Sequence, residues 1–151
     1  MSGAAETAHA TALIIGDAGV LIRGRSGAGK SGLALALIAA AALRGDFARL
    51  VCDDRVRLRR ISGRIIAEAV PAIAGLVERR GSGLEPMAHE PGARLDLVVD
   101  IVENIQRLPE VSETKTDLLG VVLPRLALAE GTAPATQCAD ILARLGAIRR
   151  T

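Results

Sequence analysis

The sequence feature that most constrains the fold is a glycine-rich segment of eight residues at positions 24–31. It satisfies the pattern G-x-x-x-x-G-K-[ST], in which small residues let successive backbone N–H groups turn inward around phosphate oxygens. Its members are Gly24, Arg25, Ser26, Gly27, Ala28, Gly29, Lys30 and Ser31. Because a short hydrophobic run precedes the segment and an alanine- and leucine-rich run follows it, the pattern predicts a strand, a phosphate-binding loop (P-loop) and a helix. An ordinary glycine-rich turn, the alternative, would not need this setting.

Each part of this loop has its own chemical role. The helix that begins at Lys30 adds its positive N-terminal end, and the Lys30 ammonium can reach the outer phosphates of a nucleotide. The Ser31 hydroxyl can ligate magnesium. We therefore predict that residues 24–31 bind the phosphates of a nucleotide together with Mg²⁺.

Composition narrows the class of protein around this loop. The 151 residues are 50% hydrophobic and 24% charged, a balance typical of one globular domain, with an expected frayed terminus at residues 1–8 and the domain at 9–151. A net charge of +2 and a single aromatic residue, Phe47, disfavour a reader of nucleic acids, which stacks bases on aromatic rings. Cys52 and Cys138 lie far apart and are expected to be reduced thiols. The longest apolar run, residues 33–43, is too short to span a bilayer and is expected to be a buried helix. Together with the reduced thiols, this indicates a cytoplasmic protein.

The rest of the pattern predicts an α/β fold. Aliphatic runs at residues 11–15 and 20–23 flank a glycine turn and predict an antiparallel hairpin, and a helix is expected from Lys30 to Arg44. Further strands are expected at residues 50–53, 56–61, 65–67, 95–102 and 116–123, and an amphipathic helix after Pro134. Residues 81–92 and 109–117 are expected to be mobile loops.

Two adjacent acids, Asp53 and Asp54, end the first strand after the P-loop helix. A magnesium-dependent phosphotransferase needs a carboxylate at the end of a neighbouring strand, either to hold the metal or to accept the proton of the attacking hydroxyl. Adjacent residues leave an extended chain in opposite directions, so the two carboxylates are expected to do different jobs. The residues alone also allow the other interpretation, a pair of ordinary surface acids in a turn.

The order of these landmarks resembles the catalytic core of the bacterial HPr kinase/phosphorylase family. In that family a histidine precedes the P-loop, as His9 does here, and the loop form G-x-S-G-x-G-K-S reads GRSGAGKS. The family's Val-Ala-Asp-Asp run appears as VCDD at residues 51–54, and its signature Leu-Glu-x-Arg-Gly-x-Gly is similar to VERRGSG at residues 77–83. The similarity covers most of residues 9–100.

The resemblance implies a kinase that uses ATP and Mg²⁺ to phosphorylate a serine on the phosphocarrier protein HPr, or on a paralogue, within a phosphotransferase system. It also implies the reverse activity, in which phosphate removes that group and pyrophosphate is released. The fold it implies is a P-loop kinase core with a mixed, largely antiparallel sheet similar to that of PEP carboxykinase. The resemblance further suggests a cytoplasmic hexamer, in a short form without the family's separate N-terminal domain.

Residue roles follow from the same resemblance by matching positions. It makes Asp54 the general base that takes the serine proton, Asp53 a support for the metal, and His9 a neighbour of the transferred group. It makes Ser31 and Glu78 magnesium ligands, and Arg80 a residue that stabilises the phosphates. The family's Pro-Val-Arg-Pro-Gly-Arg-Asn loop has no clean match, since Pro124-Arg125 is only a fragment of it.

Two other functions remain open from the sequence. One is a P-loop kinase of a small metabolite, which would need an arginine-rich lid and an acceptor pocket. The other is a nucleotide-sensing module without turnover, in which phosphate contacts matter more than a base such as Asp54.

Overall fold

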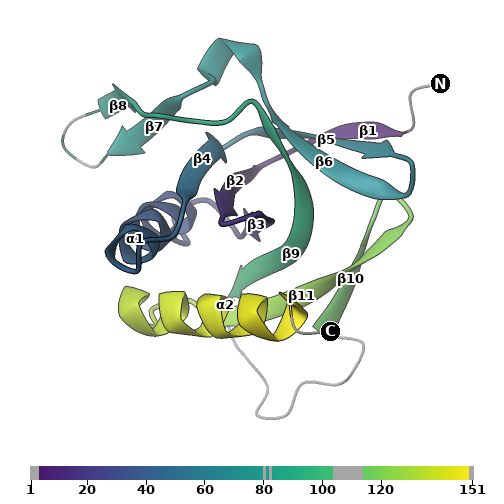
Figure 1. Ribbon diagram of the computed structural model, residues 1–151. Coiled ribbons are helices and arrows are strands. Elements are labelled where there is room, and N and C mark those ends of the chain that lie inside the picture. The colour runs from purple at the N-terminus through teal and green to yellow at the C-terminus, as the bar shows by residue number, and fades with distance from the viewer. Residues whose placement is uncertain (1–3, 80, 82, 104–113, 150–151) are drawn as a thin grey trace.

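A computed structural model describes residues 4–79, 81, 83–103 and 114–149, with only the backbone of Glu78 and Arg79. It contains a curved β-sheet with two helices on one face (Figure 1). The helices are α1 (Lys30–Leu43) and α2 (Pro134–Arg149), with a short 3-10 turn η1 (Pro71–Ile73). The strands are β1 (Ala5–Ala8), β2 (Ala10–Ile15), β3 (Ala18–Arg23), β4 (Ala48–Cys52), β5 (Val56–Ile61), β6 (Arg64–Ala69), β7 (Leu76–Arg79), β8 (Gly83–Pro86), β9 (Gly92–Val102), β10 (Lys115–Leu118) and β11 (Val121–Ala129).

The sheet is mixed, as the family resemblance implied. Its strand order is β1-β5-β6-β9-β3-β2-β4, and β11 joins β9 to β10. The pairs β3–β9 and β11–β9 are parallel, whereas the other pairs described in this sheet are antiparallel. Strands β7 and β8 form a separate hairpin that projects away from the body (Figure 1). Three strands, β3, β9 and β11, therefore end at the same edge of the sheet, and the P-loop follows the first of them.

Most of the expected elements are present. The hairpin of β2 and β3, helix α1, strands β4, β5, β6 and β9, and the C-terminal helix all lie where the sequence patterns indicated, with shifts of a few residues at their ends. None of the helices among the described residues is both long and apolar enough to span a membrane. Cys52 and Cys138 are both buried and free.

Three expectations were wrong. The frayed terminus expected at residues 1–8 contains β1, which pairs with β5, although residues 1–3 lie outside the described part. The expected strand at 116–123 is two strands, because Leu119 and Gly120 both have positive φ, 51° and 85°, and turn the chain. The loop expected at 81–92 contains β8, whose partner β7 also was not predicted. Residues 109–113, expected in a mobile loop, lie outside the described part.

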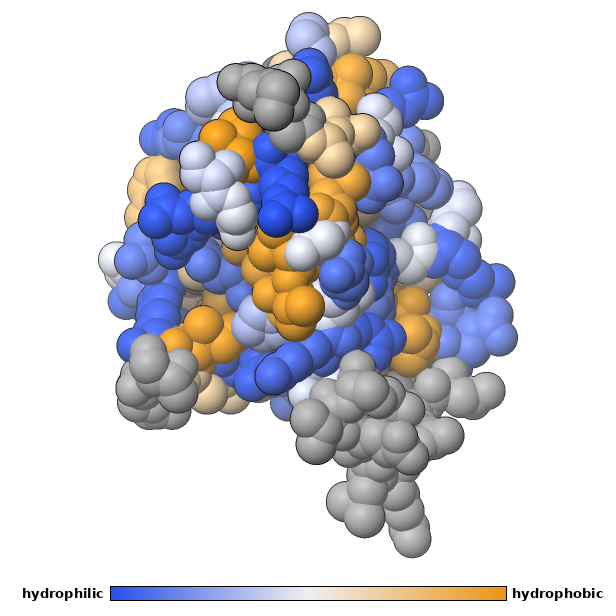
Figure 2. Space-filling view, turned by 90° about the vertical axis from the view of Figure 1, so that its right-hand side faces the viewer, coloured by the Kyte–Doolittle hydropathy of each residue, from blue (hydrophilic) through white to orange (hydrophobic). Residues whose placement is uncertain are grey.

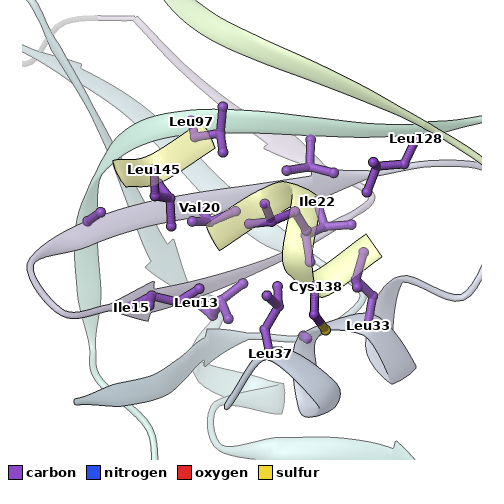
Figure 3. Packing of buried hydrophobic residues seen from close by; sticks show 14 of the residues in the cluster. Leu13, Ile15, Val20, Ile22, Leu33, Leu37, Leu97, Leu128, Cys138 and Leu145 are labelled. Atoms are coloured by element: carbon purple, nitrogen blue, oxygen red, sulfur yellow. The ribbon is translucent and has the colours of Figure 1, made fainter. Parts of the chain in front are cut away.

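One hydrophobic core lies between the helices and the central strands. Leu33 and Leu37 of α1 and Ile141 of α2 pack on Val20 and Ile22 of β3, in a cluster that also contains Leu13, Leu97 and Leu128 (Figure 3). The side chains of α1 that are buried recur three or four residues apart, so one face of the helix is fixed on the sheet. This core sets the position of the first turn of α1, where the P-loop ends.

A second core lies on the opposite face of the central strands. Leu21 and Val98 of that face pack with Leu58 of β5, Ile65 of β6 and Leu118 of β10. The sheet thus curves so that strands β5, β6 and β10 pack over this face of the central strands, and the turns of the hairpins β5–β6 and β10–β11 lie on the right of Figure 1. Figure 2 shows that side, where apolar side chains gather between hydrophilic ones. Ile61 and Val122, at the ends of these hairpins, are 39% and 61% exposed.

A charged network ties the three parallel strand ends together. Ile22 and Val99 point into the helix core, so the next residues along, Arg23 and Asp100, point to the other face. The Arg23 guanidinium donates Nε to Asp100 Oδ1 at 2.7 Å and Nη2 to Oδ2 at 2.8 Å, and Arg125 of β11 donates Nε to the same Oδ2 at 2.5 Å. Because Arg23 directly precedes Gly24, this network fixes the strand from which the P-loop emerges.

The charges of this network affect the protonation of Asp100. Burial raises the pKa of the Asp100 carboxyl, but the hydrogen bonds and positive charges of Arg23 and Arg125 outweigh burial and hold the pKa below its usual value. A carboxyl whose pKa is lower in the folded than in the unfolded state adds stability above the unfolded pKa, about 4 for Asp. That stability is lost as the pH falls through the folded pKa.

We predict that Asp100→Asn lowers the free energy of unfolding at pH 7 by about 1–3 kcal/mol, since it leaves two partly buried guanidinium groups without their carboxylate. Below about pH 4 the difference in free energy of unfolding between wild type and variant should become smaller, because the Asp100 carboxylate of the wild type is then protonated. Urea unfolding at several pH values measures both effects. Asp140→Asn, on an exposed position of α2, controls for the loss of one negative charge. A difference that is constant from pH 7 to pH 2 would contradict the account.

Candidate active site

The P-loop has the strand, loop and helix setting that the sequence predicted. It connects Arg23, the last residue of β3, to Lys30, the first residue of α1. Gly27 and Gly29 have φ values of 84° and 99°, which favour glycine, and the space around both α-carbons is open. Leu33 N–H donates to Gly29 O at 2.9 Å, so the helix hydrogen bonds begin at the loop itself. The open side of the loop can therefore receive an anion at the positive end of α1.

The Lys30 side chain folds back over the loop. Its ammonium donates to the carbonyl oxygens of Gly24 at 2.9 Å and Arg25 at 3.1 Å, and the residue is only 6% exposed. The carbonyl of Arg25 also accepts the Ala28 N–H at 3.0 Å, which closes a tight turn. The Lys30 ammonium thus lies at the loop, where two backbone carbonyl oxygens accept its hydrogen bonds.

The buried carboxylate of Asp53 joins the P-loop helix to the sheet. Asp53 follows the last residue of β4 and is 4% exposed. Its Oδ1 accepts the Ser31 hydroxyl at 2.7 Å and the Thr11 hydroxyl at 2.8 Å. Two oxygens of the kind that magnesium prefers, a hydroxyl and a carboxylate, therefore meet beside the loop.

The neighbouring carboxylate, Asp54, faces a different group. Its Oδ1 lies 2.6 Å from Nε2 of His9, the residue between β1 and β2, and the two side chains are 71% and 54% exposed. Arg55 N–H donates to Asp53 O at 2.7 Å, so Asp54 is the middle residue of a three-residue turn. Its φ of 67° is unusual for a residue other than glycine. This turn points one acid inward to the loop and the next outward to solvent.

Two of the expected site residues cannot be placed in this arrangement. Glu78 lies in β7, where its backbone pairs opposite Leu84 of β8. Arg80 lies outside the described residues. The described part brings together Lys30, Ser31 and Asp53, and separately His9 and Asp54.

Several contacts at the site were not predicted from the sequence. Thr11 lies in β2, a strand in which the sequence indicated no functional residue. Its buried hydroxyl donates a hydrogen bond to Asp53. Glu130, in the connection after β11, forms a two-point contact with Arg25 of the P-loop, with Nε–Oε1 at 2.6 Å and Nη2–Oε2 at 2.8 Å. This hydrogen bond lowers the pKa of the Glu130 carboxyl and raises that of Arg25. Asp100 could have been noticed as an acid inside an apolar strand, whereas nothing in the sequence pairs Glu130 with Arg25.

A family model described as the HPr serine kinase C-terminal domain matches residues 3–133. An HPr kinase/phosphorylase from Mycoplasma mycoides is 35% identical over 109 residues, covering 72% of this chain and 33% of that protein. Its counterpart from Bordetella petrii is 35% identical over 135 residues, covering 81% of this chain and 42% of that protein. The chain thus spans less than half the length of these curated relatives.

A solved structure, of the Hpr(Ser) kinase/phosphatase from Coxiella burnetii, is also similar. It superimposes with a TM-score of 0.75 at 26% identity, and the match covers 96% of this chain and 98% of that one. Sequence and structure comparisons agree with the resemblance drawn from the motifs. The chain belongs to the family of the HPr serine kinase C-terminal domain.

Proposed function

We propose that this chain is a protein-serine kinase that uses ATP and Mg²⁺ to phosphorylate an HPr-type phosphocarrier protein. The observation that carries the proposal is the separation of the two acids, with Asp53 on the P-loop serine and Asp54 on the solvent side beside His9. A phosphotransferase needs one carboxylate at the metal and one at the acceptor, and these positions suit both needs. Membership of the family supports HPr as the acceptor.

The residues at the loop fit a bound magnesium nucleotide. Mg²⁺ usually takes only one or two protein ligands, and phosphate oxygens and water complete its shell. Ser31 and Asp53 supply hard oxygen ligands at the P-loop, and the resemblance adds Glu78. The ion would neutralise charge on the transferred phosphoryl group.

The proposed transfer uses the protein's side chains as follows. The P-loop N–H groups and Lys30 hold the phosphates of ATP, with Arg80 as a further cation. Asp54 accepts the proton of the acceptor serine while the serine oxygen bonds to the γ-phosphorus of ATP. The bond between that phosphorus and ADP breaks. His9, 2.6 Å from Asp54, keeps that carboxylate oriented toward the acceptor. In the reverse direction, inorganic phosphate would attack the phosphorus of the phosphoserine. The bond from that phosphorus to the serine oxygen would break, pyrophosphate would leave, and Asp54 would return the proton to the serine oxygen.

Further parts of the proposal rest on the family alone. They are a single P-loop kinase domain over residues 9–151, a relationship of the sheet to that of PEP carboxykinase, a hexamer, and a cytoplasmic location. Arg125 takes no part in transfer in this proposal, because it donates to Asp100 in the network between the strands.

The direct test incubates the protein with labelled ATP, magnesium and each HPr-type protein encoded in its genome, followed by mass spectrometry of the phosphorylated site. We expect a phosphoserine on one carrier. Phosphorylation of sugars or nucleoside monophosphates but of no carrier would favour the small-metabolite kinase, and binding without any transfer would favour the nucleotide sensor.

We predict that Lys30→Ala abolishes measurable transfer, a loss of at least about two to three orders of magnitude, because the outer phosphates lose their fixed positive charge. Single-turnover assays measure the loss, and circular dichroism checks that the fold persists. Undiminished transfer by the folded variant would remove Lys30 from the site.

Asp54→Asn and Asp53→Asn should fail in different ways. Asparagine tolerates positive φ, so Asp54→Asn keeps the turn and Mg-nucleotide affinity while transfer falls by about two to four orders of magnitude, as for loss of a general base. Asp53→Asn removes the anion beside Ser31, and the variant should need more magnesium for any given rate. Calorimetric binding beside single-turnover transfer measures both. If Asp54→Asn loses nucleotide affinity together with rate, Asp54 is a metal ligand and the assignment of the base is wrong.

A further inference from the structure

Arg25 forms the charged contact between the P-loop and the connections that follow β9 and β11. Among the described residues of the loop before Lys30, it is the one whose side chain bonds outside the loop, to Glu130 at 2.6 and 2.8 Å. A second carboxylate, Glu103 after β9, lies 3.6 Å from Arg25 Nε. Ala28 packs against the helix core, whereas Gly27 and Gly29 have open space around them, so few side chains besides that of Arg25 hold the shape of the loop.

Glu130 is itself held firmly in place. Its N–H donates to Val102 O at 2.8 Å, which ties the connection after β11 to the end of β9. The buried side chain of Gln137, in the first turn of α2, donates to Ala129 O at 3.3 Å. The Glu130 side chain is only 18% exposed, whereas that of its partner Arg25 is 66% exposed. The carboxylate is thus the fixed member of the pair, and the loop residue is the member that it restrains.

Lys30 and Glu130 hold Arg25 from opposite ends of the residue. Lys30 bonds the Arg25 carbonyl from inside the loop, and Glu130 bonds the guanidinium from outside. In the proposed function the Lys30 ammonium turns to the outer phosphates of the nucleotide, so its bonds to the loop carbonyls are given up. The contact with Glu130 is independent of Lys30 and can persist with the nucleotide bound.

We propose that Glu130 is a positioning residue for nucleotide binding, which orders the P-loop through Arg25 before and while phosphates occupy it. The inference rests on the proposed nucleotide-binding role of the loop and adds to it a residue more than 100 positions away in sequence, from the connection between β11 and α2. A loop that is already ordered loses less conformational freedom when it closes on phosphate, so it binds more tightly.

The test compares Glu130→Gln with wild type by calorimetry with Mg-ADP and with the non-hydrolysable analogue Mg-AMPPNP. Glutamine keeps the size but loses the charge, and affinity should fall by about two- to five-fold, the range expected for an exposed ion pair. Amide hydrogen exchange at residues 25–29 should become faster without nucleotide. Glu68→Gln removes the charge from the 3.1 Å pair with Arg59 between β5 and β6 and is the matched control, which should leave both readouts unchanged.

The charge-exchanged pair Arg25→Glu with Glu130→Arg separates positioning from direct contact with phosphate. If Glu130 positions the loop, the double variant should recover a large part of the affinity and protection that the single variants lose. Unchanged affinity and exchange in Glu130→Gln would overturn the inference. Tighter nucleotide binding by Glu130→Gln would also overturn the inference, and so would a double variant that recovers no affinity. Either result would indicate that Arg25 binds phosphate directly and that Glu130 competes with the phosphate for it.

These outcomes are distinct from failure of the proposed function. If the wild-type chain binds neither nucleotide, the proposed function fails, and hydrogen exchange still tests whether Glu130 orders the loop. If the wild type binds nucleotide and Glu130→Gln behaves like it in both readouts, only the inference about Glu130 fails.

Discussion

The buried carboxylate of Asp53 is the contact on which the arrangement of the site depends. It accepts hydrogen bonds from the hydroxyls of Ser31 in helix α1 and Thr11 in strand β2, and it directly follows strand β4. A buried carboxylate is costly unless hydrogen bonds satisfy it, so its two partners are held where their hydroxyls can reach it. The first turn of α1 is thereby fixed against two strands. Because the P-loop directly precedes this turn, its position is fixed as well.

The charged residues around the loop follow from the direction of the strands. Because β3, β9 and β11 run parallel, their carboxyl ends meet at one edge of the sheet. Opposite charges face one another there. Within the strands, Asp100 of β9 lies between Arg23 of β3 and Arg125 of β11. In the connections that follow the strands, Arg25 after β3 faces Glu103 after β9 and Glu130 after β11. The partly buried pairs on the strands form the Asp100 network, and the exposed contact of Arg25 with Glu130 lies in the connections that follow the strands. The same edge therefore both anchors the loop and surrounds it with paired rather than free charge.

Local sequence patterns predicted the parts of the site that are close in sequence. Glycine spacing gave the P-loop, and the alternation of an extended chain indicated that Asp53 and Asp54 would face different ways, which the three-residue turn at Asp54 achieves. Contacts between distant segments were not predictable in this way. The pairing of Thr11 with Asp53 depends on the register of β2 against β4, and that of Arg25 with Glu130 spans the whole parallel part of the sheet. The turn at Leu119 was missed because leucine rarely adopts positive φ, and the apolar residues on both sides of Gly120 look like one strand.

The central claim is that Asp53 serves the metal and Asp54 serves the acceptor, although they are adjacent in the chain. A crystal structure of the protein with Mg²⁺ and a non-hydrolysable ATP analogue tests this most directly. The account predicts phosphates in the loop of residues 24–31, the metal bound by Ser31 with Asp53 in its immediate surroundings, and the Asp54 carboxylate outside the metal shell, still beside His9 and open to solvent. A metal ligated by Asp54, or a nucleotide bound away from the loop, would contradict it.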